Sequence, residues 1–546
     1  MQRVIIVGAG LGGLAAAVTA AELGLDPVVV EKGDRVGGTA AYSGGQVWIG
    51  ANHVEARLGQ PDSVEETLAY VHACAARDAG SIDDDMAREW VGNGRLAARW
   101  FEELGVIEWQ TIPGYSDYYH PDLPGSRGDG RYITGGPFDG RRLGPDRARL
   151  HVSPTFPVRL TYAEVFAWGG MNSRTTWDQA VLAQRERDDT LTFGTGTVAA
   201  FFAAARDRGV DIRTSTPVTA LLTGEDGTTV TGVHVETPAG PEELEGVVIL
   251  ATGSHDWSDE LTERFTGIPP EDGGSVAPDT VTGDAIGLVA PLGAAIGTLP
   301  SWAAPAIPGY RLPEPAGPGD TGIRAAYEQS RPHTFLVNRR GKRFADDSFH
   351  SSIIGAALTR GADGEFEHFP FFMVWDEQHR MKYGLGATPP GGEYPPGLVT
   401  SAPTLGELAE RLGIDPGGLE ETADTFNAGA AEGEDPEFGR GTNLSVRSWR
   451  GDSDHHPNPC VGTVERAPFH GMRMRLVNTG IAAAGVRTGL SGRVEREDGG
   501  FVPGLYAIGE AASRTTGGVG YNSGYSLSRA LTYGWLAAHH VAGVAP

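Results

Sequence analysis

Residues 3–13 read RVIIVGAGLGG, and residues 28–32 read VVVEK. The first run predicts a strand, a glycine turn and a helix over residues 14–23, and the second predicts a strand that ends in a carboxylate. Gly8 permits the tight turn, Gly10 lets the backbone approach a pyrophosphate, and Gly13 lets the helix pack on the strand. The helix N-terminus then faces the phosphates, while Glu31, followed by Lys32, reaches a ribose hydroxyl. These residues predict a dinucleotide-binding site.

Two short segments that follow favour FAD as the dinucleotide. Gly38 and Thr39 offer a backbone amide and a hydroxyl to phosphate oxygens. Ser43, Gly44 and Gly45 allow the backbone to run close past a flat ring. NAD-dependent enzymes usually bind their cofactor through one contiguous unit, so cofactor segments scattered along the chain indicate a flavoprotein with an interrupted nucleotide-binding domain.

Later segments extend the same site. Residues 247–253 read VVILATG, which predicts an apolar strand of the same sheet followed by a turn of small residues. Residues 504–510 read GLYAIGE, which predicts a strand that presents an acid to a ribityl chain. Val218 is expected to offer its backbone to adenine. The residues that these segments add to the predicted FAD site are Val218, Ala251, Thr252, Gly253, Gly509 and Glu510.

Composition limits the remaining possibilities. The 546 residues exceed the roughly 250–300 that one core supports, so two or more domains are expected. The net charge is −26, from 70 acidic and 44 basic side chains, which disfavours binding to nucleic acid or to an anionic membrane. Cys74 and Cys460 show no disulfide or metal-ligand spacing, and no stretch reaches the roughly 18 apolar residues of a membrane span. We therefore expect a cytoplasmic protein.

The predicted fold class is α/β, with a Rossmann-like FAD-binding domain and an inserted α+β substrate cap domain. The FAD-binding domain is expected over residues 1–283, with a loop-rich insertion at 111–160, and again over residues 468–546. Residues 284–467 contain short strands and no phosphate-binding turn, which is typical of a cap. A Pro- and Gly-rich stretch from Ala304 to Asp320 is expected to form a surface loop.

Two motifs carry a resemblance to a known family. Residues 115–125 read YSDYYHPDLPG, and residues 520–524 read GYNSG. Both are similar to motifs of the 3-ketosteroid dehydrogenases, and nearly the whole chain resembles the flavoprotein family that contains these enzymes and fumarate reductase. In fumarate reductases an arginine stands near the place of Tyr521, and a histidine pair precedes the segment at residues 481–485; neither is present here. The site is therefore expected to lack cations for a dicarboxylate, and a neutral ketone fits better.

The resemblance implies removal of hydrogen across a C–C bond beside a ketone. This chemistry needs a base for the α-proton, an acceptor for the β-hydride and polarisation of the carbonyl. Tyr521 matches the tyrosine that donates to the carbonyl in the steroid dehydrogenases, with the Gly524 N–H or the Ser523 hydroxyl as a second donor. Ser526 and Leu527, at the start of the last predicted helix, would place amides and a helix dipole near the flavin ring.

The catalytic base is left with three candidates. In the family a cap tyrosine follows an Arg-Phe-x-Asn-Glu segment, but residues 343–350 here read RFADDSFH, and Phe349 falls nearest its place. The candidates are His350, Tyr118 and Tyr119. A phenol with a pKa near about 10 needs help to act as a base, whereas a histidine near roughly 6.5 does not. The alternative interpretations are a surface histidine just before a helix for His350, and packing of loop aromatics on the cap for the tyrosines.

We therefore expect an FAD-dependent dehydrogenase that desaturates an apolar, cyclic ketone, such as a 3-ketosteroid, and passes electrons to an unknown acceptor. No metal site is predicted, because the histidine pairs at 455–456 and 539–540 lack acids or cysteines at a ligand spacing. Residues 38–48 contain no histidine for a covalent flavin link, so noncovalent FAD is expected. The alternatives are an ene-reductase running the reverse reaction, a desaturase of a polyketide or terpene, and a flavin-binding scaffold without turnover.

Overall fold

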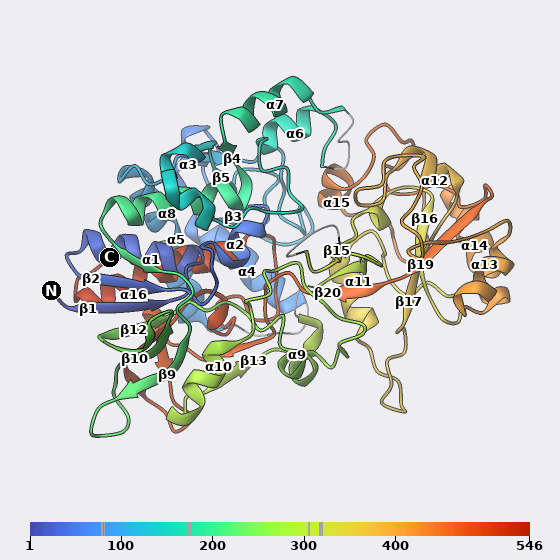
Figure 1. Cartoon of the computed structure of the whole chain (residues 1–546). Coiled ribbons are helices and arrows are strands. Elements are labelled where there is room, and N and C mark those ends of the chain that lie inside the picture. The colour runs from blue at the N-terminus through green and yellow to red at the C-terminus, as the bar shows by residue number, and fades with distance from the viewer. Residues whose placement is uncertain (78–79, 81, 172–175, 304–305, 316–319) are drawn as a thin grey trace.

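The computed structural model describes residues 1–77, 80, 82–171, 176–303, 306–315 and 320–546. Figure 1 shows a larger lobe that holds both chain termini and a smaller lobe at the other end of the molecule. The mixed α/β class predicted from the sequence is confirmed. In the described residues the helices are α1 (Leu11–Glu22), α2 (Gly38–Tyr42), α3 (His53–Arg57), α4 (Val64–Arg77), α5 (Asp84–Glu103), α6 (Tyr162–Ala167), α7 (Gln179–Arg187), α8 (Phe193–Asp207), α9 (Asp259–Thr266), α10 (Asp284–Val289), α11 (His350–Ala357), α12 (Glu377–Lys382), α13 (Leu405–Leu412), α14 (Pro416–Ala430), α15 (Leu444–Trp449) and α16 (Tyr525–Ala542).

A six-stranded sheet forms the centre of the larger lobe, in the order β22-β23-β12-β1-β2-β8. All neighbours pair in parallel except β22 with β23. Because parallel strands end at the same edge, the segments that follow β1, β2, β12 and β23 meet there. The bounds are β1 (Arg3–Val7), β2 (Asp26–Val30), β8 (Asp211–Arg213), β12 (Val247–Leu250), β22 (Arg493–Glu495) and β23 (Phe501–Ala507).

The unbroken apolar run of β1 reflects burial on both faces of this sheet. Val4 and Ile6 pack in the cluster that contains α1, while Ile5 and Val7 pack in the cluster beneath the three-stranded antiparallel sheet β11-β10-β9. That smaller sheet consists of β9 (Val218–Thr223), β10 (Val230–Thr237) and β11 (Gly240–Glu245). Successive side chains of β1 thus pack in two different cores, because successive residues of a strand point to opposite faces of the sheet.

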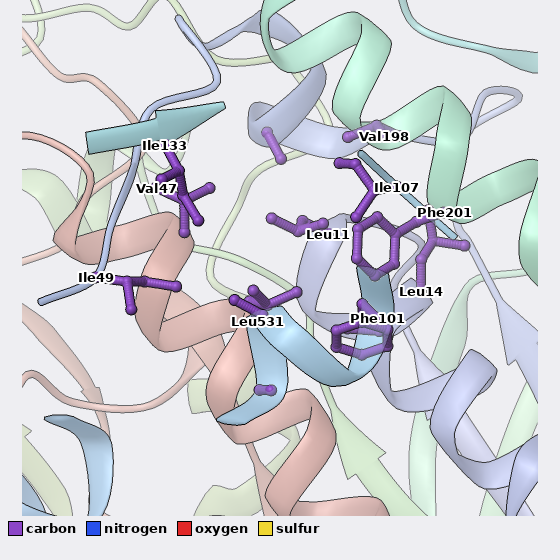
Figure 2. Packing of buried hydrophobic residues seen from close by; sticks show 14 of the residues in the cluster. Leu11, Leu14, Val47, Ile49, Phe101, Ile107, Ile133, Val198, Phe201 and Leu531 are labelled. Carbon is purple, nitrogen blue, oxygen red and sulfur yellow. The ribbon is translucent and has the colours of Figure 1, made fainter. Parts of the chain in front are cut away.

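On the helical face, α1 packs closely against α16, with α5 and α8 beside them. A Cβ atom at Gly534 would lie 2.5 Å from the Gly12 carbonyl oxygen, so the two backbones approach without a side chain between them. Figure 2 shows this core, in which Leu14 points toward the rings of Phe101 and Phe201. Those rings meet edge to face with centroids 4.8 Å apart. This packing fixes the N-termini of α1 and α16 at the carboxyl edge of the sheet.

The smaller lobe is built on a four-stranded antiparallel sheet, β16-β17-β19-β18 (Figure 1). Its strands are β16 (Thr334–Asn338), β17 (Phe371–Trp375), β18 (Thr400–Ala402) and β19 (Phe469–Arg473). One face packs on α13 and α14, and the other packs on α11. This arrangement agrees with the predicted α+β cap and with the short strands expected within residues 284–467.

The chain between the lobes carries short strands that bear on the domain limits. β13 (Ile296–Thr298) pairs with β21 (Ala484–Val486), and Ala285 and Val289 pack in the core of the larger lobe. β14 (Ile307–Arg311) pairs with β15 (Ile323–Ala325) and β20 (Arg475–Val477). Pairing and packing thus favour a cap that begins after β13 and ends after β20, rather than at the predicted residues 284 and 467. The division into domains remains a proposal.

The remaining strands pair within the 111–160 region and beside it, namely β3 (Val47–Trp48), β4 (Trp109–Thr111), β5 (Tyr132–Gly135), β6 (Phe138–Asp139) and β7 (Thr190–Leu191). The prediction of a surface loop from Ala304 to Asp320 is wrong for β14, which is buried because it joins a sheet. Residues 304–305 and 316–319 lie outside the described residues.

Every described helix is too short or too polar to act as a membrane span. In the same part of the chain, no group of three His, Cys, Asp or Glu side chains could hold a metal ion.

Candidate active site

A cavity lies at the carboxyl edge of the central sheet and is also lined by residues of α11 and α15 in the smaller lobe. The space not filled by protein atoms amounts to about 1760 Å³ when the open solvent at the mouth of the cavity is included. The cavity thus extends from the edge of the sheet to the smaller lobe.

Most of the predicted cofactor residues line this cavity. They come from seven separate segments, four of which follow the strands β1, β2, β12 and β23 of the central sheet. These residues are Gly8, Gly10, Glu31, Lys32, Gly38, Thr39, Ser43, Gly44, Val218, Ala251, Thr252, Gly253, Gly509, Glu510, Ser526 and Leu527.

Gly13 and Gly45 do not line the cavity. A Cβ atom at Gly13 would collide with the Gly8 carbonyl oxygen, which agrees with the predicted packing of helix on strand. Gly45 has a φ of +71°, and its Cβ would lie 2.5 Å from the Gly194 backbone nitrogen. Gly45 therefore permits contact with α8 rather than the approach to a flat ring that its sequence position predicted.

The wall of the cavity fits the pyrophosphate and ribose of FAD. A Cβ atom at Gly10 would have no neighbour closer than the Gly37 oxygen at 3.9 Å, so a side chain there would occupy cavity space. Gly10 is also the N-cap of α1 and has no side-chain cap, which leaves the helix N-terminus available to an anion. The Thr252 Oγ1 atom is buried without a hydrogen-bond partner among the described residues. Such an atom is accounted for by a bound ligand.

The two charged residues after β2 behave differently. Glu31 accepts hydrogen bonds from the backbone nitrogens of Ala9, at 2.9 Å, and Gly33, at 2.8 Å. Burial raises the pKa of this carboxyl, and the two N–H donors oppose that rise. Its remaining lone pairs suit ribose hydroxyls. The Lys32 ammonium is engaged, because its Nζ lies 2.8 Å from the Asp284 carboxylate.

The end of β23 and the start of α16 supply the last cofactor residues. Glu510 is buried, and its carboxylate accepts hydrogen bonds from Arg529 Nη1 at 3.1 Å and from the Ala482 nitrogen at 3.3 Å. Ser526 and Leu527 belong to the first turn of α16. The cap of this helix is a glycine without a side-chain hydrogen bond, so its N-terminal dipole faces the cavity as predicted.

Another part of the wall is a phenol cluster, which we define as Tyr118, Tyr327 and Tyr521. His350 and Ser523 line the cavity beside it. The Tyr118 ring lies with its centroid 6.2 Å from that of Tyr521 and 5.5 Å from that of His350. Segments more than 150 residues apart in the sequence thus converge on one site.

Tyr521 is held as a neutral phenol. Burial raises its pKa well above the usual value near 10, and the neighbouring Tyr118 adds to this effect. A phenol that stays protonated can donate a hydrogen bond to a carbonyl oxygen and continue to donate as negative charge develops there. Gly524 also lines the cavity, at the cap of α16.

Tyr118 faces opposing influences. Burial raises its pKa to about 12, while the positive charge of Arg450 and a hydrogen bond from Ser523 act in the opposite direction. Ser523 lines the same cavity, and its role as a second donor to the carbonyl stays a prediction. An ionised Tyr118 would be a strong proton acceptor beside Tyr521.

The predicted interpretation of His350 as a surface residue is wrong. The side chain is buried at the start of α11, with 6% exposure, and it lines the cavity. Burial, followed by the charge of Arg450, lowers its pKa to about 3. The chemical argument for a histidine base assumed an ordinary pKa near 6.5. At about 3 the ring is neutral but a weak proton acceptor.

Tyr119 points elsewhere. It does not line the cavity, and the Arg77 guanidinium lies over its ring at 4.5 Å from the centroid. Phe349 packs against both Tyr118 and Tyr119, with centroids 5.6 and 5.9 Å away. The geometry therefore separates the two adjacent tyrosines, and only Tyr118 belongs to the phenol cluster.

Asn522 holds the cluster together, although the sequence did not identify it as a site residue. Its Oδ1 accepts hydrogen bonds from the Tyr118 nitrogen and the Tyr70 hydroxyl, each at 2.9 Å. Its Nδ2 donates to the Tyr132 hydroxyl at 2.5 Å. The side chain is fully buried. Its position between Tyr521 and Ser523 in the GYNSG motif was the available signal.

Asp117 anchors the loop that carries Tyr118. Its carboxylate accepts hydrogen bonds from Trp48 Nε1 at 2.7 Å, from Arg131 Nη1 at 2.9 Å and from the Arg127 nitrogen at 2.9 Å. Arg131 also pairs with Asp62 at 2.7 Å. This buried network gives Tyr118 a fixed position, and nothing local in the sequence indicated it.

The expected absence of the cations that bind a dicarboxylate concerned two positions, those of Tyr521 and of the segment at residues 481–485. Arg450, at the end of α15, lines the same cavity as the phenol cluster. The sequence comparison looked for cations only where fumarate reductases carry them. Arg450 enters the site from the smaller lobe, which no motif of the sequence connects to Tyr521.

Comparisons with known proteins agree with this geometry. The family model described as "FAD binding domain" matches residues 3–527. The 3-oxosteroid 1-dehydrogenase of Mycolicibacterium smegmatis is 30% identical over 99% of this chain and 97% of its own length. The 4-oxocyclohexanecarboxylate 2-dehydrogenase of Sinomonas cyclohexanicum is 32% identical over 99% of this chain and 93% of its own length.

A solved structure extends the agreement to three dimensions. The 3-ketosteroid delta1-dehydrogenase from Sterolibacterium denitrificans, in complex with 1,4-androstadiene-3,17-dione, superposes with a TM-score of 0.89. The two sequences are 26% identical, and the match covers 100% of each chain. The chain belongs to the FAD-binding flavoprotein family, as an FAD-dependent oxidoreductase related to the 3-oxosteroid 1-dehydrogenases.

Proposed function

We propose that this protein introduces a double bond next to the carbonyl of a cyclic ketone. The observation that carries the proposal is the pairing of two phenols, Tyr118 and Tyr521, with ring centroids 6.2 Å apart in the cavity that fits FAD. One phenol remains a donor and the other becomes a base, which are the two roles that enolate formation needs.

The cofactor is held by the turns at the carboxyl edge of the sheet, chiefly Gly10, Glu31, Thr252 and Glu510. Bound FAD supplies the acceptor for the hydride that leaves the β-carbon, so the substrate loses one proton and one hydride and becomes an enone. The electrons then pass to a carrier that this chain does not identify.

Tyr521 is proposed to bind the carbonyl oxygen. Its raised pKa keeps the hydroxyl protonated, so it stabilises the negative charge that collects on oxygen as the α-proton leaves. The Gly524 N–H is the proposed second donor.

Tyr118 is proposed to take the α-proton, in preference to His350 and Tyr119. His350 is a weak base because burial lowers its pKa to about 3, and Tyr119 lies outside the cavity. Arg450 and Ser523 favour the ionised form of Tyr118.

The relatives define two candidate ring systems, a 3-oxosteroid and an oxocyclohexane. Desaturation of a polyketide or terpene ketone, and the reverse reaction on an enone, use the same groups. The polar groups of the phenol cluster disfavour a flavin-binding scaffold without turnover.

Anaerobic mixing of the purified holoenzyme with a panel of steroid and cyclohexanone ketones tests the proposal. We expect loss of the oxidised flavin absorbance near 450 nm with at least one ketone, and formation of the matching enone. Tyr521→Phe should reduce this rate by about 1,000-fold, because it removes a donor to the developing oxyanion. Tyr119→Phe is the matched control and should stay within about twofold of the wild-type rate. If no ketone bleaches the flavin, or if both variants behave alike, the proposal is wrong.

A further inference from the structure

The cavity wall contributed by α15 carries two hydrogen-bond donors that the protein does not use. Arg450 Nη1 and Trp449 Nε1 are both buried, and neither has a hydrogen-bond partner among the described residues. Both residues line the cavity. They stand at the C-terminal end of α15, next to each other in the sequence.

Other buried arginines in the described chain either pair with a carboxylate or, as Arg331 and Arg514 do, donate to backbone carbonyl oxygens. Arg131 lies 2.7 Å from Asp62, Arg343 lies 2.8 Å from Asp435, and Arg529 lies 3.1 Å from Glu510. Arg450 is 9% exposed, and no described carboxylate lies within 4.0 Å of its guanidinium. Its guanidinium instead stacks over the Tyr327 ring at 4.1 Å and the Trp449 ring at 4.6 Å. A buried cation without a carboxylate is costly unless a ligand supplies the missing charge.

The position of α15 relative to Tyr118 is fixed. Asn443 caps the start of α15, and its Nδ2 donates to the Tyr118 carbonyl oxygen at 2.9 Å. The helix that carries Arg450 is therefore attached to the loop that carries the proposed base. The guanidinium acts on Tyr118 and His350 through its charge, so it lies at the substrate part of the cavity.

We propose that the cyclic ketone of this enzyme carries an anionic group, such as a carboxylate, which binds Arg450 and Trp449 while Tyr521 holds the carbonyl. Both side chains offer donors and no acceptor, a combination that suits a carboxylate and does not suit a hydroxyl or a second ketone. The inference rests on the proposed desaturation and names the substrate class of the same site.

A competing role for Arg450 is support of the Tyr118 phenolate alone. Loss of the guanidinium would then slow the reaction of charged and neutral substrates equally. If Arg450 binds a substrate anion, its loss also weakens the binding of charged substrates, and neutral ones keep their affinity. The two roles therefore separate into an effect on kcat and an effect on KM.

The test compares 4-oxocyclohexanecarboxylate with its methyl ester, which has the same ring and no charge. Wild-type enzyme should have a KM at least about tenfold lower for the acid. Arg450→Gln should raise the KM for the acid by about 30- to 100-fold and leave the KM for the ester within about threefold, whatever change in kcat both share. Arg447→Gln, on the same helix but outside the cavity, is the control and should change neither value.

Three results would overturn the inference: equal KM values of the wild type for acid and ester, a preference for the ester, or equal effects of Arg450→Gln on both. The KM values of the wild type for the acid and the ester test the inference even if the Arg450→Gln variant fails to fold. Binding is also followed without turnover, by the change that cyclohexanecarboxylate causes in the visible flavin spectrum. If neither ketone reduces the flavin while this acid still binds through Arg450, the proposed desaturation fails and the anion site stands.

Discussion

The cofactor part and the substrate part of the cavity are built in different ways. Where FAD fits, the wall is mostly backbone: glycine turns, small residues and helix N-termini at the ends of parallel strands. Where the ketone is proposed to bind, the wall is made of side chains, the phenol cluster with His350, Trp449 and Arg450. Short local motifs determine the backbone geometry of the cofactor part. The side-chain cluster of the substrate part depends instead on which distant segments the fold brings together.

The largest expected effect comes from filling the cofactor part. In Gly10→Val the new side chain would enter the cavity, because the nearest neighbour of a Cβ atom there is the Gly37 oxygen at 3.9 Å. We expect FAD affinity to fall by about 100-fold or more, since the pyrophosphate loses its approach to the backbone. The flavin absorbance per protein of the purified variant measures this.

Gly92→Ala is the control, because no atom lies within 4 Å of a Cβ atom at Gly92 on α5. It should retain FAD fully. If the Gly10→Val protein binds FAD normally, the assignment of this part of the cavity to the cofactor is wrong.

The second prediction concerns the proposed base, whose loss affects turnover and leaves FAD bound, and it sharpens the contrast within the substrate part. Tyr118 accepts a proton only when ionised, and its pKa lies near 12. The ionised fraction, and with it kcat/KM, should therefore rise by up to about tenfold per pH unit from pH 7 to pH 10. A base with the pKa of His350, about 3, would already be deprotonated and would give a flat profile over that range.

Tyr118→Phe should lower kcat by about 100- to 1,000-fold and abolish the rise with pH, while FAD stays bound. The profile is measured as the initial rate of enone formation with a saturating artificial electron acceptor. A flat wild-type profile, or a Tyr118→Phe profile that still rises, would exclude Tyr118 as the base.

The smallest expected effect concerns Asn522, which touches neither cofactor nor ketone in the proposal. Asn522→Ala leaves the Tyr118 N–H and the Tyr70 hydroxyl without their shared acceptor, which costs about 2 kcal/mol of stability. We expect kcat to fall by about tenfold, because the Tyr118 loop loses its position, and KM to change little. Thermal unfolding and the pH profile are the measurements.

A role limited to stability would lower the melting temperature and leave kcat per folded enzyme unchanged. Asn443→Ala offers a matched comparison, since it removes a hydrogen bond to the carbonyl on the same residue, Tyr118. It should shift the position of α15, and so affect the Arg450 end of the site more than Asn522→Ala does.

The sequence predicted the cofactor half of the site well. The turns after β1, β2 and β12 line the cavity as expected, because glycine spacing and apolar strands determine the local backbone. Gly45 is the exception: its positive φ was consistent with the sequence, but the partner that requires it is α8. Local sequence shows that a residue must be small, and it does not show which neighbour imposes that requirement.

Candidate catalytic residues were predicted less well, for a physical reason. Tyr118, Tyr119 and His350 were all candidates in sequence, and the fold separated them by placing Tyr119 outside the cavity and burying His350 enough to lower its pKa to about 3. A residue's pKa depends on desolvation and on charges from distant segments, so the sequence gives only its ordinary value.

By itself the sequence determined an FAD-binding α/β fold with a cap, because this fold follows from short-range periodicity, glycine turns and composition, and the resemblance of the GYNSG motif implied the role of Tyr521. Only the tertiary structure decided that Asn522 ties Tyr118 into the cluster and that the guanidinium of Arg450 faces the same cavity. The hydrogen bond between Asn522 and Tyr118 joins residues 404 positions apart, and such a contact forms only through packing that buries both partners together. The chemistry of the substrate site is in this sense a property of the folded chain.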